Sequence, residues 1–402
     1  MKIQAQTTLK QPLLLLYLLA LSSLNGQRYL TPIFPNVDRD LGVQYGQAAA
    51  LSGFTVDLEM DIHEPAGDTQ AERPLMILAH GGYFVYGDRS LMSGICDYYA
   101  ERGYVTATIS YRLGVNAFNI ANLNEELLKA AARATQDFNA AIRFFYRSAR
   151  DEGNPYRIDT TRIIVGGNSA GSIAAIHSQL FIDASTADAT LQQIVGNLGG
   201  IQGGNNGSVG YPDRAAGLLN FAGAIYDSNM INTAHIACIS FHGDNDSVVP
   251  YAVGQASFSG LQVMEMHGSA IVHAKLTEFG APATSMNTFP NVGHGLFDDQ
   301  ARADTMLNRT TRFFYDHVIP GSGMFAASPN TSRVLFYPNP VRTGCLNIET
   351  DRATAFVILD LLGKKHLEGK LSMGTHSIDV SRLPAGIYWL RTNRLTEQLI
   401  IH

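Results

Sequence analysis

A serine framed by glycines is the first feature of this chain whose residue types could do chemistry. Residues 162–172 form a short apolar run that breaks into glycines around Ser169 and then continues as a helical pattern. Gly167 and Gly171 give the pattern G-x-S-x-G, in which small residues allow a turn sharp enough to raise the serine hydroxyl above a sheet edge. The turn also places the N–H of Ala170 at a helix N-terminus, where an anionic oxygen is stabilised. The pattern is typical of attack on an acyl carbon, which also requires an acid and a base.

A candidate acid follows a later strand-like run. In sites of this kind the partners follow in the order serine, acid, histidine, each at the carboxyl end of a strand. Residues 236–241 are apolar and lead directly into two carboxylates, Asp244 and Asp246. We assign Asp246 as the acid that orients the base. Asp244 is the competing candidate, but its place right at the strand end suits a residue that caps the turn.

The candidate base is His294, which follows the strand-like residues 284–289. The chain has 12 histidines, so an ordinary surface or core role is the alternative. Glycines on both sides of His294 leave its ring on a flexible turn with room to reach a neighbour. His80 and His242 also lie at strand ends, and we interpret both as structural. No cofactor is needed and no metal site is expected, because no two of these histidines have ligand spacing with a third ligand nearby.

A second glycine-rich turn could stabilise negative charge. His80, Gly81, Gly82 and Tyr83 follow the unbroken apolar run of residues 74–79. In this architecture the loop after that strand supplies part of an oxyanion hole, and each donor is worth about 3 kcal/mol. We predict that the N–H groups of Gly82 and Tyr83 act beside that of Ala170, with His80 and Gly81 in support.

The elements that must position these residues alternate between strands and helices. Strands are expected at residues 54–63, 74–79, 104–111, 163–165, 217–224, 236–241 and 284–289, and helices directly after Ser169 and at 127–145, 271–279 and 298–318. Unbroken apolar runs are typical of strands covered on both faces. Residues 54–63 instead alternate apolar and charged side chains, which indicates an edge strand. The order predicts an α/β fold with a doubly wound, mostly parallel sheet.

The loop at residues 197–210 is rich in glycine and asparagine and has no periodicity. We interpret it either as a mobile rim or cap over the site or as a plain surface loop. The chain between Ser169 and Asp246 carries no long apolar insertion of the kind that would cover a fatty chain. This favours short acyl groups.

The N-terminus has the pattern of a secretory signal peptide. Lys2 and Lys10 precede an apolar stretch at residues 12–21, and small polar residues follow as far as Gly26. This stretch is too short for a typical membrane span, so we expect cleavage after residue 26; an N-terminal anchor helix is the alternative. The chain has 3 cysteines, too few for a disulfide framework.

The pattern changes after residue 320. Residues 321–332 have the composition of a linker, and residues 333–402 show short strands separated by turn residues, which predicts a small all-β sandwich. Residues 27–327 hold 18 Lys and Arg against 29 Asp and Glu, whereas residues 328–402 hold 9 against 6. The acidic larger part argues against nucleic acid as its partner.

Together these motifs resemble those of a known family. His80-Gly81-Gly82, Gly167–Gly171, the run from His242 through Asp246 to Pro250, and Gly293-His294-Gly295 resemble an α/β-hydrolase of the bacterial carboxylesterase type, in particular acetyl and feruloyl esterases. The resemblance covers about residues 45–320, includes Ser110-Tyr111-Arg112 and also favours Asp246 as the acid. Many relatives have a third glycine at the position of Tyr83.

The tail resembles a second family. Its motifs, among them Tyr337-Pro338-Asn339-Pro340 and Leu361-Leu362-Gly363-Lys364, are similar to the C-terminal sorting domain of the type IX (Por) secretion system. The resemblance implies that the type IX machinery is a partner. It also implies export through the outer membrane, followed by release or attachment at the cell surface.

We therefore expect a signal peptide (1–26), an α/β-hydrolase catalytic domain (27–320), a linker (321–332) and a sorting domain (333–402). The expected activity is hydrolysis of short-chain carboxylic esters, including acetyl or feruloyl groups on plant polysaccharide. A serine peptidase of the prolyl-oligopeptidase kind and a lipase or polyester hydrolase share the triad and are the alternatives, and a non-catalytic adhesin is a third reading.

Overall fold

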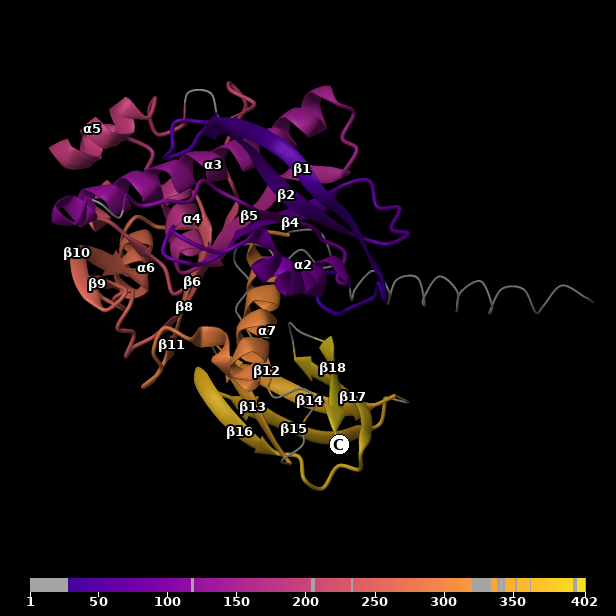
Figure 1. The fold of residues 1–402 in the computed structure, drawn as a ribbon. Coiled ribbons are helices and arrows are strands. Elements are labelled where there is room, and N and C mark those ends of the chain that lie inside the picture. Colours follow the sequence, from indigo (N-terminus) through magenta and orange to yellow (C-terminus); the bar gives the residue numbers. More distant parts are fainter. Residues whose placement is uncertain are drawn as a thin grey trace, which may run out of the picture. The chain divides into compact units, whose positions relative to one another are not determined.

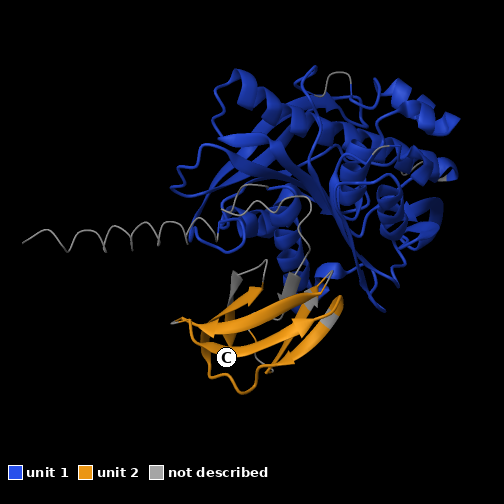
Figure 2. Ribbon diagram, turned by 180° about the vertical axis from the view of Figure 1, so that it is seen from behind, with its two compact units in different colours: residues 1–324 blue, residues 325–402 orange. Residues whose placement is uncertain are grey.

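The computed structural model describes residues 28–319 except 117–118, 204–206 and 233, and residues 334–401 except 338–340, 342–343, 351–352, 362 and 393–395. The chain divides into two compact units, Met1–Met324 and Phe325–His402 (Figure 2). The predicted signal peptide and the predicted linker both lie outside the described residues. Their boundaries, and those of the two predicted domains, stay predictions.

Unit 1 is built on an eight-stranded sheet with the order β1-β2-β4-β3-β5-β6-β8-β11 (Figure 1). The strands are β1 (Val37–Ala49), β2 (Thr55–Pro65), β3 (Arg73–Ala79), β4 (Val105–Ile109), β5 (Ile158–Asn168), β6 (Gly217–Phe221), β8 (Ala237–Gly243) and β11 (Thr284–Phe289). Neighbours from β4 to β11 are parallel, and β1 and β2 are antiparallel. The predicted α/β class with a mostly parallel sheet is confirmed.

Helices cover both faces of this sheet. They are α2 (Ser93–Ala100), α3 (Leu123–Asp151), α4 (Ala170–Leu180), α5 (Ala189–Asn197), α6 (Ser269–Glu278) and α7 (Gln300–His317). In β3, Leu75 and Ile77 pack in one apolar core with α3, α4 and α6, whereas Met76 and Leu78 pack in a second core with α2 and α7. Because successive side chains point to opposite faces, a strand covered on both sides must be apolar throughout.

The prediction that residues 54–63 form an edge strand is wrong. Strand β2 lies between β4 and β1, with which it pairs along ten positions from Val37↔Pro65 to Ala49↔Thr55. The sequence of β1 is polar and glycine-containing and much of it is exposed, so it carries no apolar period. Pairing with β2, and not burial of its own side chains, holds it in the sheet.

A small second sheet in unit 1 was not predicted. It has the order β7-β10-β9, with strands β7 (Ala224–Ile225), β9 (Val253–Phe258) and β10 (Leu261–Gly268). Strands β9 and β10 are joined by Ser259 and Gly260, both with positive φ (49° and 84°). Two central residues with positive φ are typical of a type I′ hairpin turn.

Unit 2 consists of antiparallel strands in two sheets, β12-β13-β16 and β15-β14-β17-β18. The strands are β12 (Val334–Tyr337), β13 (Cys345–Thr350), β14 (Thr354–Asp360), β15 (Lys365–Leu371), β16 (Gly374–Asp379), β17 (Gly386–Thr392) and β18 (Thr396–Ile401). One apolar core joins both sheets, with Leu346 and Ile348 from the first and Ile358 and Leu390 from the second. The predicted all-β second domain is confirmed; strand β15 was not predicted.

Within the described ranges, every helix is too short or too polar to cross a membrane. The three cysteines are free thiols: Cys96 and Cys238 are buried and Cys345 is half-buried.

Candidate active site

Ser169 lies at the sharp turn between β5 and α4. Its backbone is strained, with φ 54° and ψ −119°, and its N–H donates to the carbonyl oxygen of Phe221 at 2.8 Å. The flanking glycines are required by close backbone contacts, because a Cβ at Gly167 or Gly171 would lie 2.5 Å or 2.2 Å from the carbonyl oxygen of Ala79. The turn therefore holds the serine hydroxyl above the sheet edge in a conformation that persists only because the surroundings impose it.

His294 connects Ser169 to Asp246. Its Nε2 lies 2.8 Å from Ser169 Oγ, and its Nδ1 lies 2.7 Å from Asp246 Oδ2. Ser169 and His294 are 125 residues apart in the chain, and each follows a strand of the parallel sheet. A serine hydroxyl, an imidazole and a carboxylate joined in this order can act as nucleophile, general base and orienting acid.

The environment of Asp246 keeps this carboxylate ionised. Its side chain is fully buried, and Oδ1 accepts hydrogen bonds from the N–H groups of Val248 and Val249 at 2.8 and 3.0 Å. Burial disfavours the charged form, but hydrogen bonds from His242 and His294 and the Val248 N–H outweigh it and hold the pKa of Asp246 well below its usual range. Asp246 can therefore stabilise a positive charge that develops on His294.

The competing carboxylate, Asp244, has a different position. It is exposed, and its Oδ1 accepts a hydrogen bond from the N–H of Asn291 at 2.6 Å. Asn291 has a φ of 59° and lies in the turn that leads to His294. Asp244 thus fastens this turn, as expected for a capping residue; its hydrogen bond goes to Asn291 and not to the His294 ring.

The loop predicted to hold the oxyanion donors lies against the serine. A Cβ at Gly81 would be 3.3 Å from Ser169 Cβ. Gly82, Tyr83 and Phe84 have consecutive positive φ values of 118°, 55° and 63°. No described residue accepts a hydrogen bond from the N–H of Gly82 or Tyr83, and Ala170 is the first residue of α4. These N–H groups are thus available to a developing oxyanion.

Contacts at both ends keep this loop in place. His80 is buried, which lowers its pKa and keeps the ring neutral, and its Nδ1 donates to the carbonyl oxygen of Gly81 at 2.6 Å. The ring of Tyr111 stacks on His80 at 4.5 Å, and its hydroxyl donates to the carbonyl oxygen of His80 at 2.8 Å. At the other end, the N–H of Gly114 donates to the carbonyl oxygen of Phe84 at 2.8 Å.

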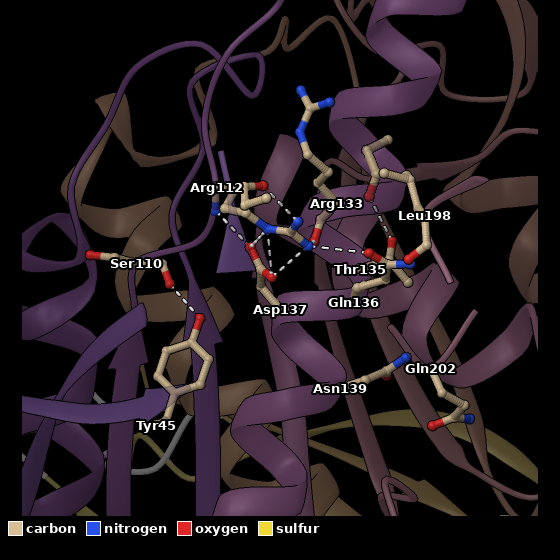
Figure 3. A network of polar contacts seen from close by, with 12 residues as sticks. Tyr45, Ser110, Arg112, Arg133, Thr135, Gln136, Asp137, Asn139, Leu198 and Gln202 are labelled. Carbon is tan, nitrogen blue, oxygen red and sulfur yellow. Dashed lines mark hydrogen bonds and ion pairs between the residues drawn. The ribbon is translucent and has the colours of Figure 1, made fainter. Parts of the chain in front are cut away.

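The segment that makes these contacts is itself fixed to α3. Arg112 and Asp137 form a buried ion pair at 2.9 Å, and Arg112 also contacts the side-chain oxygen of Gln136 at 3.1 Å (Figure 3). Arg133, on the same helix, donates to the carbonyl oxygen of Gly114 at 2.5 Å. Since both partners of the ion pair are buried, removing either would leave an uncompensated charge.

Comparisons with known proteins identify families that the two units resemble. Residues 60–197 match the BD-FAE family, the bifunctional feruloyl and acetyl esterases, and residues 335–402 match the secretion system C-terminal sorting domain. The first unit is a carboxylesterase domain that is similar to the BD-FAE family. The second unit is a type IX sorting domain, which directs a protein to secretion or to the cell surface.

Similar solved structures include three of esterase 2 from Thermogutta terrifontis, each 18% identical to this chain. The butyrate-bound structure has a TM-score of 0.49, and the match covers 72% of this chain and 97% of that one. The propionate-bound structure and the one phosphoramylated by tabun have TM-scores of 0.47 and 0.48, and each match covers 71% of this chain and 96% of the other. Among curated protein sequences, none matches this chain.

An apolar pocket of about 610 Å³, open to solvent, begins at Ser169 of the esterase domain. Its lining includes residues of the site itself (Tyr83, Ser169, Ala170), of helices α3 and α4 (Leu127, Leu128, Ala131, Ile173, His177), of the turn after Asp246 (Val248, Val249) and of the β9–β10 hairpin (Ala256, Phe258, Val263, Met264, Met266). The ring of Tyr83 contacts that of Phe258 edge-on at 5.6 Å. The pocket can therefore hold an apolar group attached to the reacting carbonyl.

Two groups of lining residues were not recognised in the sequence. The hairpin was missed, although Ser259-Gly260 between two runs of alternating character is a signal for a two-residue turn. Leu127 and Ala131 lie at the start of the segment predicted as a helix, residues 127–145, and at this end of α3 their apolar side chains line the pocket. Periodicity reports which side of a helix is apolar, and not whether a neighbouring element or a ligand covers it.

The loop at residues 197–210 does not cap this pocket in its described part. Gln136 of α3 donates to the carbonyl oxygens of Leu198 and Gly200 at 3.0 and 2.6 Å, and Arg143 donates to those of Gln202 and Gly207 at 2.9 and 3.1 Å. The described residues of the loop are thus fastened along α3, and none of them lines the pocket at Ser169. Figure 3 shows the contact between Gln136 and Leu198.

Proposed function

We propose that the esterase domain hydrolyses short-chain carboxylic esters through an acyl-enzyme on Ser169. One observation carries the proposal: the unbroken hydrogen-bonded series from Asp246 through His294 to Ser169, at the mouth of an apolar pocket. A hydroxyl activated in this way, beside unpaired backbone donors, suits attack on an ester carbonyl.

The reaction has two stages. In the first, Ser169 Oγ bonds to the carbonyl carbon while its proton passes to His294 Nε2; the bond to the alcohol oxygen then breaks and that oxygen takes the proton. In the second, water attacks the acyl-enzyme, His294 accepts the water proton and returns it to Ser169, and the acid leaves. Asp246 holds the imidazole in the tautomer with a proton on Nδ1 and stabilises the imidazolium that forms in each stage.

The oxyanion of each tetrahedral intermediate would be bound by the N–H groups of Gly82, Tyr83 and Ala170. The contacts of His80, Tyr111 and Gly114 support this role, since they hold a loop with three positive φ values in one conformation. Such donors act in place, without reorganising during the reaction.

Short acyl groups, with acetyl and feruloyl esters of polysaccharides among the substrates, fit the proposal best. The family match supports this substrate class. The chain between Ser169 and Asp246 also forms no long apolar cap in its described part; its helix α5 and loop pack against α3.

A substrate panel tests the proposal. Purified protein is assayed on short-acyl and long-acyl aryl esters, acetylated xylan, feruloyl esters and a peptide substrate. We expect kcat/KM to be highest for esters with two to four acyl carbons. Higher values for twelve-carbon esters would contradict the short-chain assignment, and turnover of peptides alone would favour a peptidase.

The matched variants are Ser169→Ala, His294→Ala and Asp246→Asn. Each is expected to lower kcat by at least about 10⁴-fold without unfolding the protein, because the three residues act as a unit. Full activity in Ser169→Ala would exclude the mechanism.

A further inference from the structure

A second apolar compartment adjoins the pocket at Ser169. It measures about 380 Å³, a value that includes space open to solvent, and it is lined on its far side by Leu191 and Val195 of α5 and by Ile201. The two compartments share three lining residues: Leu128 and Ala131 of α3 and His177 of α4. These three side chains therefore form the partition between them.

Helix α4 leads from the serine into both compartments. Ala170 and Ile173 line the first compartment, His177 lines both, and Phe181, directly after the helix, lines the second. The spacing of three and four residues places them on one face of the helix. At 1.5 Å per residue, the partition lies about 12 Å and the second compartment about 18 Å from Ser169 along the helix axis.

The partition is held firmly on one side. Nδ1–H of His177 donates to the carbonyl oxygen of Ile173 at 2.8 Å, and its Nε2 accepts from the N–H of Tyr226 at 3.2 Å. Both ring nitrogens are thus occupied, and the side chain is buried with 6% exposure. Leu128 lines the same two compartments and is also buried, at 7% exposure, but its side chain makes no hydrogen bond that would fix its rotamer.

The position of His294 determines which part of the ester enters the pocket. The leaving alcohol takes its proton from His294 Nε2, so the alcohol must face that ring. The described lining of the first compartment includes Tyr83, Ser169 and Ala170 but not His294. The acyl group, and not the alcohol, therefore enters the pocket.

We propose that Leu128 and His177 form a gate that sets the longest acyl group the enzyme accepts, and that the second compartment holds the end of longer acyl chains when the gate is opened. This inference rests on the proposed ester hydrolysis at Ser169. It assigns acyl-length selection to the junction of α3 and α4, remote in sequence from the triad.

The test compares Leu128→Ala with Leu127→Ala. Leu127 is the neighbouring leucine of α3 and lines only the first compartment, so its truncation widens the pocket without joining the two spaces. The assay uses p-nitrophenyl esters with two to twelve acyl carbons, and the quantity compared is kcat/KM for the ten-carbon ester divided by kcat/KM for the four-carbon ester. Leu128→Ala should raise this ratio at least about tenfold, whereas Leu127→Ala should change it less than about threefold.

Two further arms complete the test. In the double variant Leu128→Ala/Ile201→Trp, the indole fills the second compartment and the gained activity on ten-carbon esters should be lost.

If Leu128→Ala does not fold, Ala131→Leu replaces it as the test, because this change narrows the partition on a helix that favours leucine. It should lower the ratio of kcat/KM for six-carbon over two-carbon esters at least about fivefold. A series of acetate esters with lengthening alcohols should show no dependence on position 128.

An unchanged acyl-length profile in folded Leu128→Ala would overturn the inference, as would an equal change in Leu127→Ala or a change confined to the alcohol series. These outcomes can be distinguished from a failure of the proposed function. In that case the wild-type protein itself would turn over no ester, or Ser169→Ala would retain full activity.

Discussion

His242 Nε2 lies 3.2 Å from Asp246 Oδ2, the same oxygen that binds His294 Nδ1 at 2.7 Å. His242 also contacts the carbonyl oxygen of Val249 at 3.1 Å and the hydroxyl of Ser269 at 2.7 Å. It therefore braces the turn that carries Asp246, as its place at the strand end had suggested. Asp246 and Asp244 are two residues apart, but only Asp246 joins this cluster.

The two carboxylates should differ sharply on substitution. Asp246→Asn is expected to lower kcat by at least about 10⁴-fold, because the amide would favour the wrong imidazole tautomer. Asp244→Asn should cost less than about tenfold, since it weakens only one hydrogen bond in the turn before His294. Steady-state kinetics on a short-chain aryl ester measure both, and the reverse ranking would show that Asp244 is the acid.

Tyr111→Phe should impair catalysis without impairing binding. The change removes the hydroxyl that donates to the carbonyl oxygen of His80 and so loosens the oxyanion loop. We expect kcat to fall about tenfold with KM nearly unchanged, because the affected donors act mainly in the transition state. The control is Tyr104→Phe, since Tyr104 is equally buried and its hydroxyl has no partner among the described residues. Equal effects of the two substitutions would contradict the positioning role.

His177 should make stability depend on pH. Burial lowers the pKa of His177 to about 4 in the folded protein, while an unfolded histidine titrates near 6.5. Between these values the unfolded chain binds a proton that the folded chain does not, so the free energy of unfolding falls as pH drops from about 6.5 to 4, by about 3 kcal/mol in total. Denaturant unfolding of wild type and His177→Gln at pH 7, 5.5 and 4.5 measures this. The variant should show a shallower decline, and parallel curves would exclude the assignment.

The sorting domain should be dispensable for chemistry. The triad residues and the oxyanion segments all belong to unit 1, and unit 2 has an apolar core of its own. Deleting residues 328–402 should leave kcat/KM of the purified protein within about twofold, whereas in the native host the truncated enzyme should accumulate in the periplasm. A folded but inactive truncated protein, or one that still reaches the surface, would show that the tail has another role.

The sequence alone was sufficient to choose three residues that the structure brings together at the candidate site. Ser169, Asp246 and His294 each follow an apolar run, and the carboxyl ends of parallel strands meet at one edge of a sheet. Once the α/β class is inferred from alternating strands and helices, those residues must converge. The hydrogen bonds between these residues, and the contact of the loop at Gly81 with Ser169, follow because the topology places the strand ends side by side.

Only the tertiary structure showed which strand forms the edge of the sheet and which residues line the pocket. Strand β1 is held by backbone pairing with β2, which leaves no apolar period in its sequence, and the pocket wall combines Leu128 of α3, His177 of α4 and Met266 of the β9–β10 hairpin. A periodic pattern reports that a side chain avoids water, but not what it packs against. The identity of the covering element, and the space left beside it, follow from how distant segments pack together.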